Sequence, residues 1–265
     1  MRKFATLAGL ILAGFLLLSG CTANLFMEWD KPEVPSASDM NNKAQDDPDG
    51  FIDDVEDYLE GDAVDDDNAD DVIKALKKIY DPESGNPPEG ETEQQAALLI
   101  GEVAIAGDEN AGQVVENLAG VVTAIADGTS DDPEDFIKAL IPQGLSSQEF
   151  ADMVESLVAA GEAYLAFGES IGPGATAEDV PFMSDAEIGD TLNRAAAGIA
   201  VIAALDALDG TVDGGYNIAD IGVLQDVVDG TADFGGIDPT VAFDDATTGY
   251  EGAAYLLDLA GFSEE

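Results

Sequence analysis

Apolar residues recur along most of this chain at intervals of three and four positions, and no other feature restricts its possible folds as strongly. Within residues 51–59 the apolar positions fall at i, i+1, i+4, i+7 and i+8, which places them on one face of an α-helix. The same spacing returns in later segments, whereas no segment keeps the period-two alternation typical of a half-buried strand. The sequence therefore predicts an all-α fold.

Start and stop signals divide this pattern into about eight or nine helices, arranged as a helical bundle or a short α-solenoid. Three residue pairs have the spacing of a capping box, in which each side chain binds the other residue's backbone N–H. These pairs are Thr92 with Gln95, Ser146 with Glu149 and Ser184 with Glu187. The expected helices cover residues 51–59, 72–80, 92–106, 114–126, 132–140, 146–165, 184–208, 218–229 and 240–260.

Four glycines lie inside these expected helices, where each costs about 1 kcal/mol relative to alanine. Close approach between neighbouring helices would explain the choice of residue, and we expect such contacts at these positions. The four are Gly101, Gly120, Gly161 and Gly198.

The most apolar internal segment runs from Ala195 to Leu205 and has no polar side chain. It is shorter than the roughly 20 apolar residues that span a bilayer, so we expect a helix buried in a core.

One short segment occurs twice in the chain. Residues 71–76 and 135–140 differ only in their second residue and lie 64 positions apart. A helical solenoid would produce such an internal match. Chance similarity in a chain rich in Ala and Asp would produce it as well, and both interpretations remain open.

The first 21 residues have the layout of an export signal. After a short basic segment, residues 4–18 form an uncharged, mostly apolar run that is too short to span a bilayer as a helix. The run ends in Leu18-Ser19-Gly20-Cys21, which resembles the lipobox of bacterial lipoproteins. The resemblance implies a cleaved signal peptide over residues 1–20 and a diacylglyceryl group on the sulfur of Cys21. An ordinary secretory signal with a chance cysteine is the alternative.

The lipobox resemblance places the mature protein in the cell envelope, attached to the lipid bilayer through acylated Cys21. Thr22 follows the cysteine where an Asp would signal inner-membrane retention, so the outer membrane is favoured if the cell is Gram-negative. Residues 21–48 contain several Pro, Ser and Asn residues and little periodicity, and we expect a flexible tether there. Residues 49–265 are then a single all-α domain.

Acidic residues outnumber basic residues by 56 to 9, the net charge is −47, and histidine is absent. This charge excludes a nucleic-acid partner, since a phosphate backbone requires a basic surface. The absence of histidine excludes Ser-His and Cys-His catalysis within the chain. The acidic surplus is spread along the sequence and resembles that of proteins from salt-loving organisms. A specific acidic surface for a cationic partner or for calcium is the alternative.

Residues 209–220 have the ligand order of a calcium loop, with oxygen donors at positions 1, 3, 5, 7, 9 and 12 and glycine at position 6. The segment resembles the EF-hand-like loop of dockerin modules, although those modules need a second loop that this chain lacks. A turn rich in Asp and Gly that caps two helices is the alternative. The candidate ligands are Asp209, Thr211, Asp213, the carbonyl of Gly215, Asn217 and Asp220.

Three hypotheses follow for the function. The first is a non-enzymatic envelope lipoprotein whose all-α body binds or scaffolds an envelope protein or a solute. The second is a calcium-dependent adhesion or assembly module built around residues 209–220. The third is a hydrolase that uses paired carboxylates, although so many acidic residues single out no pair. We expect that the protein is not an enzyme. Ca²⁺ is the one cofactor that the sequence suggests.

Overall fold

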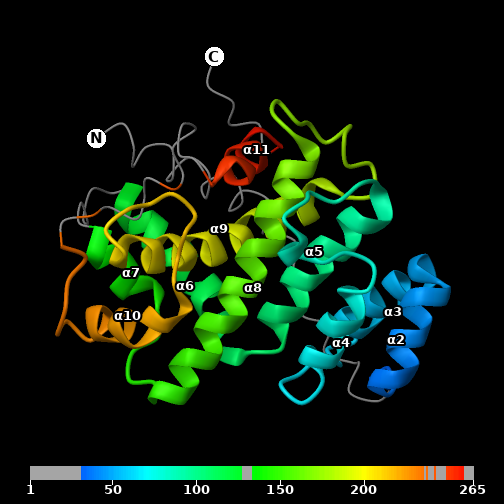
Figure 1. Ribbon diagram of the computed structural model, residues 1–265, viewed down its shortest axis with the longest axis horizontal. Helices are drawn as coiled ribbons and strands as arrows, with labels where there is room; N and C mark the ends of the chain where they lie inside the picture. The colour runs from blue at the N-terminus through cyan, green and yellow to red at the C-terminus, as the bar shows by residue number, and fades with distance from the viewer. Residues whose placement is uncertain (1–30, 127–132, 236, 238–241, 243–248, 260–265) are drawn as a thin grey trace.

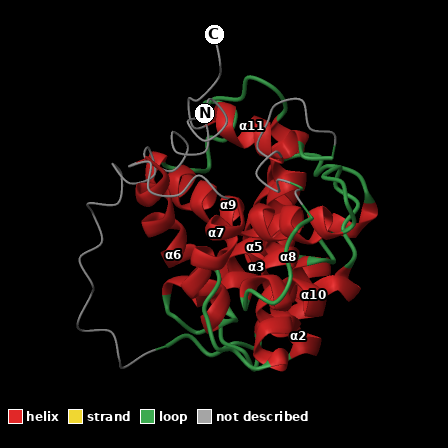
Figure 2. Cartoon of the chain, turned by 90° about the vertical axis from the view of Figure 1, so that its left-hand side faces the viewer, coloured by secondary structure: helices red, strands yellow, loops and turns green. Residues whose placement is uncertain are grey.

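Figure 1 shows the computed structural model of the chain, which describes residues 31–126, 133–235, 237, 242 and 249–259. Ten α-helices and no strand occur within these ranges (Figure 2), which confirms the all-α prediction. The helices are α2 Ala37–Asp46, α3 Pro48–Glu60, α4 Ala69–Leu76, α5 Glu91–Ala106, α6 Glu109–Ala126, α7 Pro133–Leu140, α8 Ser147–Ile171, α9 Asp185–Leu208, α10 Ile221–Val228 and α11 Glu251–Leu259.

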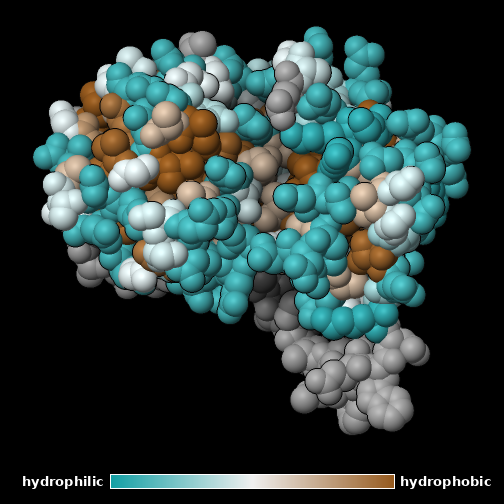
Figure 3. Space-filling view, turned by 60° about the horizontal axis from the view of Figure 1, so that its bottom comes forward, coloured by the Kyte–Doolittle hydropathy of each residue, from teal (hydrophilic) through white to brown (hydrophobic). Residues whose placement is uncertain are grey.

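Helix α8 crosses the middle of the molecule and makes its most extensive contacts with α9 and α5. Helices α2, α3 and α4 gather at one end beside α5, and α6, α7 and α10 gather at the other end (Figure 1). One continuous core of buried apolar side chains runs through both ends, from Met40 to Leu259. Hydrophilic side chains cover most of the face shown in Figure 3, around a large apolar area on its left side and smaller ones elsewhere.

Glycines allow the two longest helices, α8 and α9, to approach closely. A Cβ atom added to Gly198 would lie 2.7 Å from the backbone nitrogen of Gly161, and one added to Gly161 would lie 2.8 Å from the carbonyl carbon of Gly198. A Cβ on Gly101 would meet the ring of Tyr164 at 2.6 Å. Close helix approach therefore explains three of the four expected positions, and the surroundings of Gly120 lie outside the described side chains.

The apolar segment of α9 lies inside the core, as expected. Every residue from Ala195 to Leu205 is buried. Within the described part of the chain, α9 is the one helix long and apolar enough to cross a membrane, and 83% of its most apolar window is covered by the rest of the body. Burial of this kind is typical of the central helix of a globular domain.

The folded body begins earlier than the expected boundary at residue 49. Helix α2 lies within the segment predicted to be a flexible tether, and its Met40 and Ala44 are buried. Ser36 caps this helix by accepting a hydrogen bond from the backbone N–H of Asp39. Only two of its ten residues face the core, so the hydrophobic periodicity was too weak to predict it.

Two of the three expected capping boxes are present, at Ser146 and at Ser184. The third is wrong, because α5 begins two residues earlier, after Gly90. The hydroxyl of Thr92 instead donates a hydrogen bond to Asp49 at 2.8 Å, which ties the start of α5 to α3. Other helix ends also differ: α4 stops at Leu76 rather than near Tyr80, and α11 begins at Glu251 rather than near residue 240.

Candidate functional site

The predicted lipid-attachment residue, Cys21, and the whole predicted signal peptide lie outside the described residues. Their assignment stays a prediction from the sequence.

The predicted calcium loop follows directly after α9 and is organised around a carboxylate that precedes it. Asp206 is fully buried, and its Oδ2 accepts hydrogen bonds from the backbone N–H groups of Asp213 and Gly214, both at 2.7 Å. The hydroxyl of Tyr250 donates to the same oxygen at 3.2 Å. Asp206 therefore holds the loop against α9 and α11. Its other oxygen, Oδ1, is buried without a hydrogen-bond partner in the described structure.

The candidate ligands themselves serve local turns in this conformation. Asp213 accepts from the N–H of Gly215 at 3.3 Å, and Asn217 accepts from the N–H of Ala219 at 3.1 Å, which caps a short 3₁₀ turn. The C-cap of α9 is Asp209, the N-cap of α10 is Asp220, and Thr211 and Gly215 are exposed.

Gly214 has the left-handed φ of 85° that the sharp turn at loop position 6 requires. Among the described residues, however, no three carboxylate, thiol or imidazole side chains come close enough together to hold a metal ion. The acidic side chains of the loop are therefore not gathered here, and calcium binding stays a prediction.

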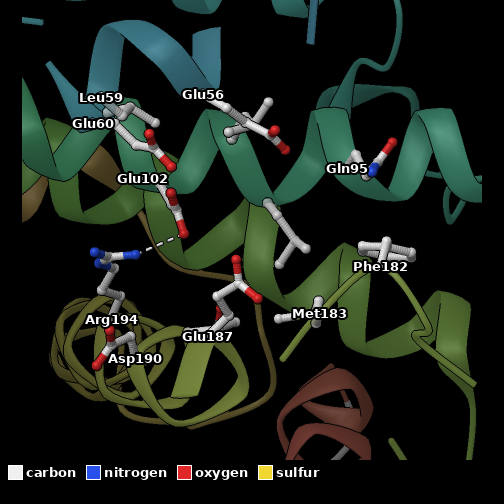
Figure 4. Close-up of a pocket in the computed structure, with 13 residues that line it drawn as sticks. Glu56, Leu59, Glu60, Gln95, Glu102, Phe182, Met183, Glu187, Asp190 and Arg194 are labelled. Carbon is white, nitrogen blue, oxygen red and sulfur yellow. Dashed lines mark hydrogen bonds and ion pairs between the residues drawn. The ribbon is translucent and has the colours of Figure 1, made fainter. Parts of the chain in front are cut away.

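A pocket that the sequence analysis did not identify lies between α3, α5 and α9 (Figure 4). Its cavity has a volume of about 230 Å³. Helix α3 contributes Glu56, Leu59 and Glu60 to its walls. The rest of the wall comes from α5, α9 and the segment before α9, as Gln95, Leu98, Leu99, Glu102, Phe182, Met183, Glu187, Asp190, Thr191 and Arg194.

Five of these lining side chains are carboxylates and only one is a cation. The carboxylates come from three helices that are distant in the sequence, as Glu56, Glu60, Glu102, Glu187 and Asp190. Burial raises the pKa of Glu56 above its ordinary value, and the negative charges of Asp53, Glu102, Glu187 and Glu60 raise it further. The acidic groups of α3, α5 and α9 thus lie close enough to repel one another.

The single cation is Arg194, which is one of only two arginines in the chain. Its guanidinium pairs with the carboxylate of Glu102 across the α5–α9 interface, with an N–O distance of 2.6 Å. Burial nevertheless raises the pKa of Glu102 above its ordinary value, although the charge of Arg194 acts in the opposite direction. The charge of Asp190 also raises the pKa of Arg194. No ion pair within the described part of the chain involves Glu56, Glu60 or Glu187.

The two ends of the pocket differ in character. In Figure 4, Arg194 and Asp190 lie toward one end, and Phe182, Met183 and Gln95 lie toward the other. Glu187 is held near the middle, because its carboxylate also accepts the capping hydrogen bond from the N–H of Ser184. The pocket therefore combines a charged end with a largely apolar end.

Tyr164 lies beneath the charged end. Its ring fills the space that Gly101 leaves on α5, and its side chain is fully buried. Its hydroxyl faces the guanidinium of Arg194, so Arg194 contacts both this buried tyrosine and Glu102.

No family model, no curated protein and no solved structure matches the chain.

Proposed function

We propose that the protein is a non-enzymatic binding protein of the cell envelope, attached to a membrane through a lipid on Cys21, which holds a small solute in the α3–α5–α9 pocket. The observation that supports this proposal most is the pocket itself, in which eight polar or charged side chains and five apolar ones surround a cavity. A concave site where polar groups from several elements converge, some with shifted pKa values, is the usual place to look for a ligand.

The charge arrangement supports binding rather than covalent chemistry. Glu102 has the raised pKa that suits a general acid, but Arg194 is paired with its carboxylate and opposes protonation. The remaining carboxylates stand around the cavity without a histidine, a thiol or a hydroxyl nucleophile paired to a base. We therefore propose that these groups bind and orient the ligand; a hydrolase that used Glu56, whose pKa is also raised, would instead release the molecule chemically changed.

Blocking the pocket tests this function. Gln95 is half-buried on α5 and lines the cavity, so Gln95→Trp should fill the space without replacing a core residue. Gln113→Trp adds the same ring at an exposed position of α6 and is the matched control. Each full-length protein is equilibrated with a soluble extract of its source cells, and the retained small molecules are identified by mass spectrometry.

The wild type and Gln113→Trp should retain the same small molecule, chemically unchanged, at about one molecule per chain. The amount that Gln95→Trp retains should be at least about tenfold lower. Equal retention by all three proteins, or none by the wild type, would show that the pocket is not a solute site.

The calcium-dependent adhesion or assembly module is a second candidate, favoured by one observation. The unpartnered Oδ1 of Asp206 is buried directly beneath the 209–220 loop, where a cation would compensate its charge. A calcium titration of thermal unfolding, in the wild type and in Asp213→Ala, separates this candidate from the solute-binding function.

A further inference from the structure

We infer that the ligand of the α3–α5–α9 pocket is a small organic ammonium ion with an apolar tail. This inference rests on the proposed binding function and specifies its ligand. Three features of the pocket carry it: the excess of carboxylates at one end, their spread around the cavity, and the apolar side chains at the other end.

The charge of the pocket selects a cation. Five carboxylates face the cavity and Arg194 neutralises one of them, so an anion or a neutral polar molecule would leave the mutual repulsion at Glu56 unrelieved. A cation relieves it, most strongly near the half-buried Glu102 and Asp190. The other three carboxylates are exposed, so solvent screens their charges more. The half-buried Asp190 is the acidic group that the incoming cation would meet beside Arg194.

The spacing of the carboxylates selects an organic cation over a metal ion. A metal ion requires several oxygen ligands that converge within about 2.0–2.6 Å of one point. No three described acidic side chains converge in that way. An ammonium group accepts longer and less directional contacts, through hydrogen bonds of roughly 2.7–3.2 Å that point in different directions.

The opposite end of the pocket selects an apolar tail. Phe182 and Met183 extend from the segment before α9, and Leu98 and Leu99 line the cavity from α5. An aromatic ring and a thioether make favourable contacts with alkyl or aryl groups. The cavity of about 230 Å³ is smaller than the roughly 300–1,000 Å³ that drug-sized ligands occupy, so the tail must be short.

The inference is tested by calorimetric titration of the full-length protein in detergent, at constant ionic strength. The probe is 2-phenylethylammonium. Its matched controls are 2-phenylethanol, which has the same shape and no charge, and 3-phenylpropanoate, which has the opposite charge. The ammonium probe should bind at least about tenfold more tightly than the alcohol, and the carboxylate should show no saturable binding.

Amide variants distinguish the effect of the pocket carboxylates on binding from the effect of the overall negative charge of the chain. Glu60→Gln and Asp190→Asn should each weaken binding of the ammonium probe about three- to tenfold, because each removes one carboxylate from the cavity. Glu155→Gln removes the same charge from an exposed position of α8 and should leave binding unchanged. Phe182→Ala should weaken the ammonium probe and the alcohol by the same factor.

Equal affinity for the ammonium probe and the alcohol would overturn the inference, and so would an equal effect of Glu155→Gln and Asp190→Asn. Competition by magnesium at concentrations near that of the protein would also overturn it, in favour of an inorganic cation. If the probe does not bind while Gln95→Trp still abolishes solute retention, the ligand class is wrong and the binding function stands.

Discussion

Replacing Gly198 by alanine should destabilise the protein by about 2 kcal/mol, although alanine is the better helix former by about 1 kcal/mol. The added methyl group would lie 2.7 Å from the backbone nitrogen of Gly161 and from the carbonyl oxygen of Leu157. Neither backbone atom can move without shifting α8 as a whole, and α8 is the helix around which the body packs. The melting temperature should fall by roughly 4–8 °C in a calorimetric scan.

Gly112→Ala is the matched control for this substitution. Gly112 lies inside α6, and a Cβ atom there meets nothing within 4 Å. The same chemical change should therefore raise stability by up to about 1 kcal/mol at Gly112. A shift of the same sign at both positions would show that the close approach of α8 and α9 is not what requires glycine at residue 198.

The melting temperature should rise with potassium chloride by on the order of 10 °C between about 0.1 M and about 1 M. Nine basic residues can pair with only a small part of the 56 acidic ones. Each pair of neighbouring like charges lowers the free energy of unfolding by about 0.2–0.5 kcal/mol. Screening about ten such pairs therefore raises the free energy of unfolding by a few kcal/mol. The screening length falls from about 10 Å to about 3 Å over this range.

A variant with fewer surface charges identifies the cause of the salt effect. Asp66, Glu155 and Glu178 are exposed, and their combined replacement by the corresponding amides should raise the melting temperature at low salt and leave it unchanged at about 1 M. A melting temperature that is flat or falling with salt would contradict the halophile-like interpretation of the acidic composition.

Calcium is tested in the same kind of melting experiment, in place of potassium chloride. If the 209–220 loop binds the ion, calcium should stabilise the wild type at concentrations too low for screening, by about 2.7 kcal/mol at a hundred times Kd. Asp213→Ala should lose this response and keep the response to potassium chloride. An equal response of both proteins to calcium would leave the loop as a turn held by Asp206.

The helical architecture could be predicted from the sequence, because the long helices bury one face and carry clear start signals. Ser146 and Ser184 begin α8 and α9 as their capping pattern indicates. Helix α2 was missed because only Met40 and Ala44 of its ten residues are buried. The capping box predicted at Thr92 was wrong, because a Thr with a Gln three residues later also occurs inside the first turn of a helix.

The pocket could not be predicted, because its parts come from three helices that meet only in the folded chain. With 56 acidic residues, no spacing singles out Glu60, Glu102 and Asp190 as neighbours. Two weak signals were present in the sequence. Glu102 interrupts an otherwise apolar stretch of α5, and Arg194 is the only arginine outside the first three residues. A half-buried acid and a rare cation of this kind indicate that each has a partner, but the sequence does not say which residue it is.

The loop at residues 209–220 shows the opposite case, in which a pattern is visible and its cause is not. The spacing of oxygen donors predicted a cation at the centre of the loop. In the structure the backbone of the loop instead surrounds Asp206, which precedes the motif and has no place in the calcium pattern. This role depends on the folded structure, in which the loop folds back onto the end of α9.

The measurement that tests the proposed envelope function most directly is the mass of the N-terminal peptide of the protein isolated from its own membranes. We expect a peptide that begins at Cys21, carries a diacylglyceryl group on its sulfur, and lacks residues 1–20. An unmodified thiol on Cys21, or a peptide that still contains residues 1–20, would contradict the claim that this protein is a lipid-anchored binding protein of the cell envelope.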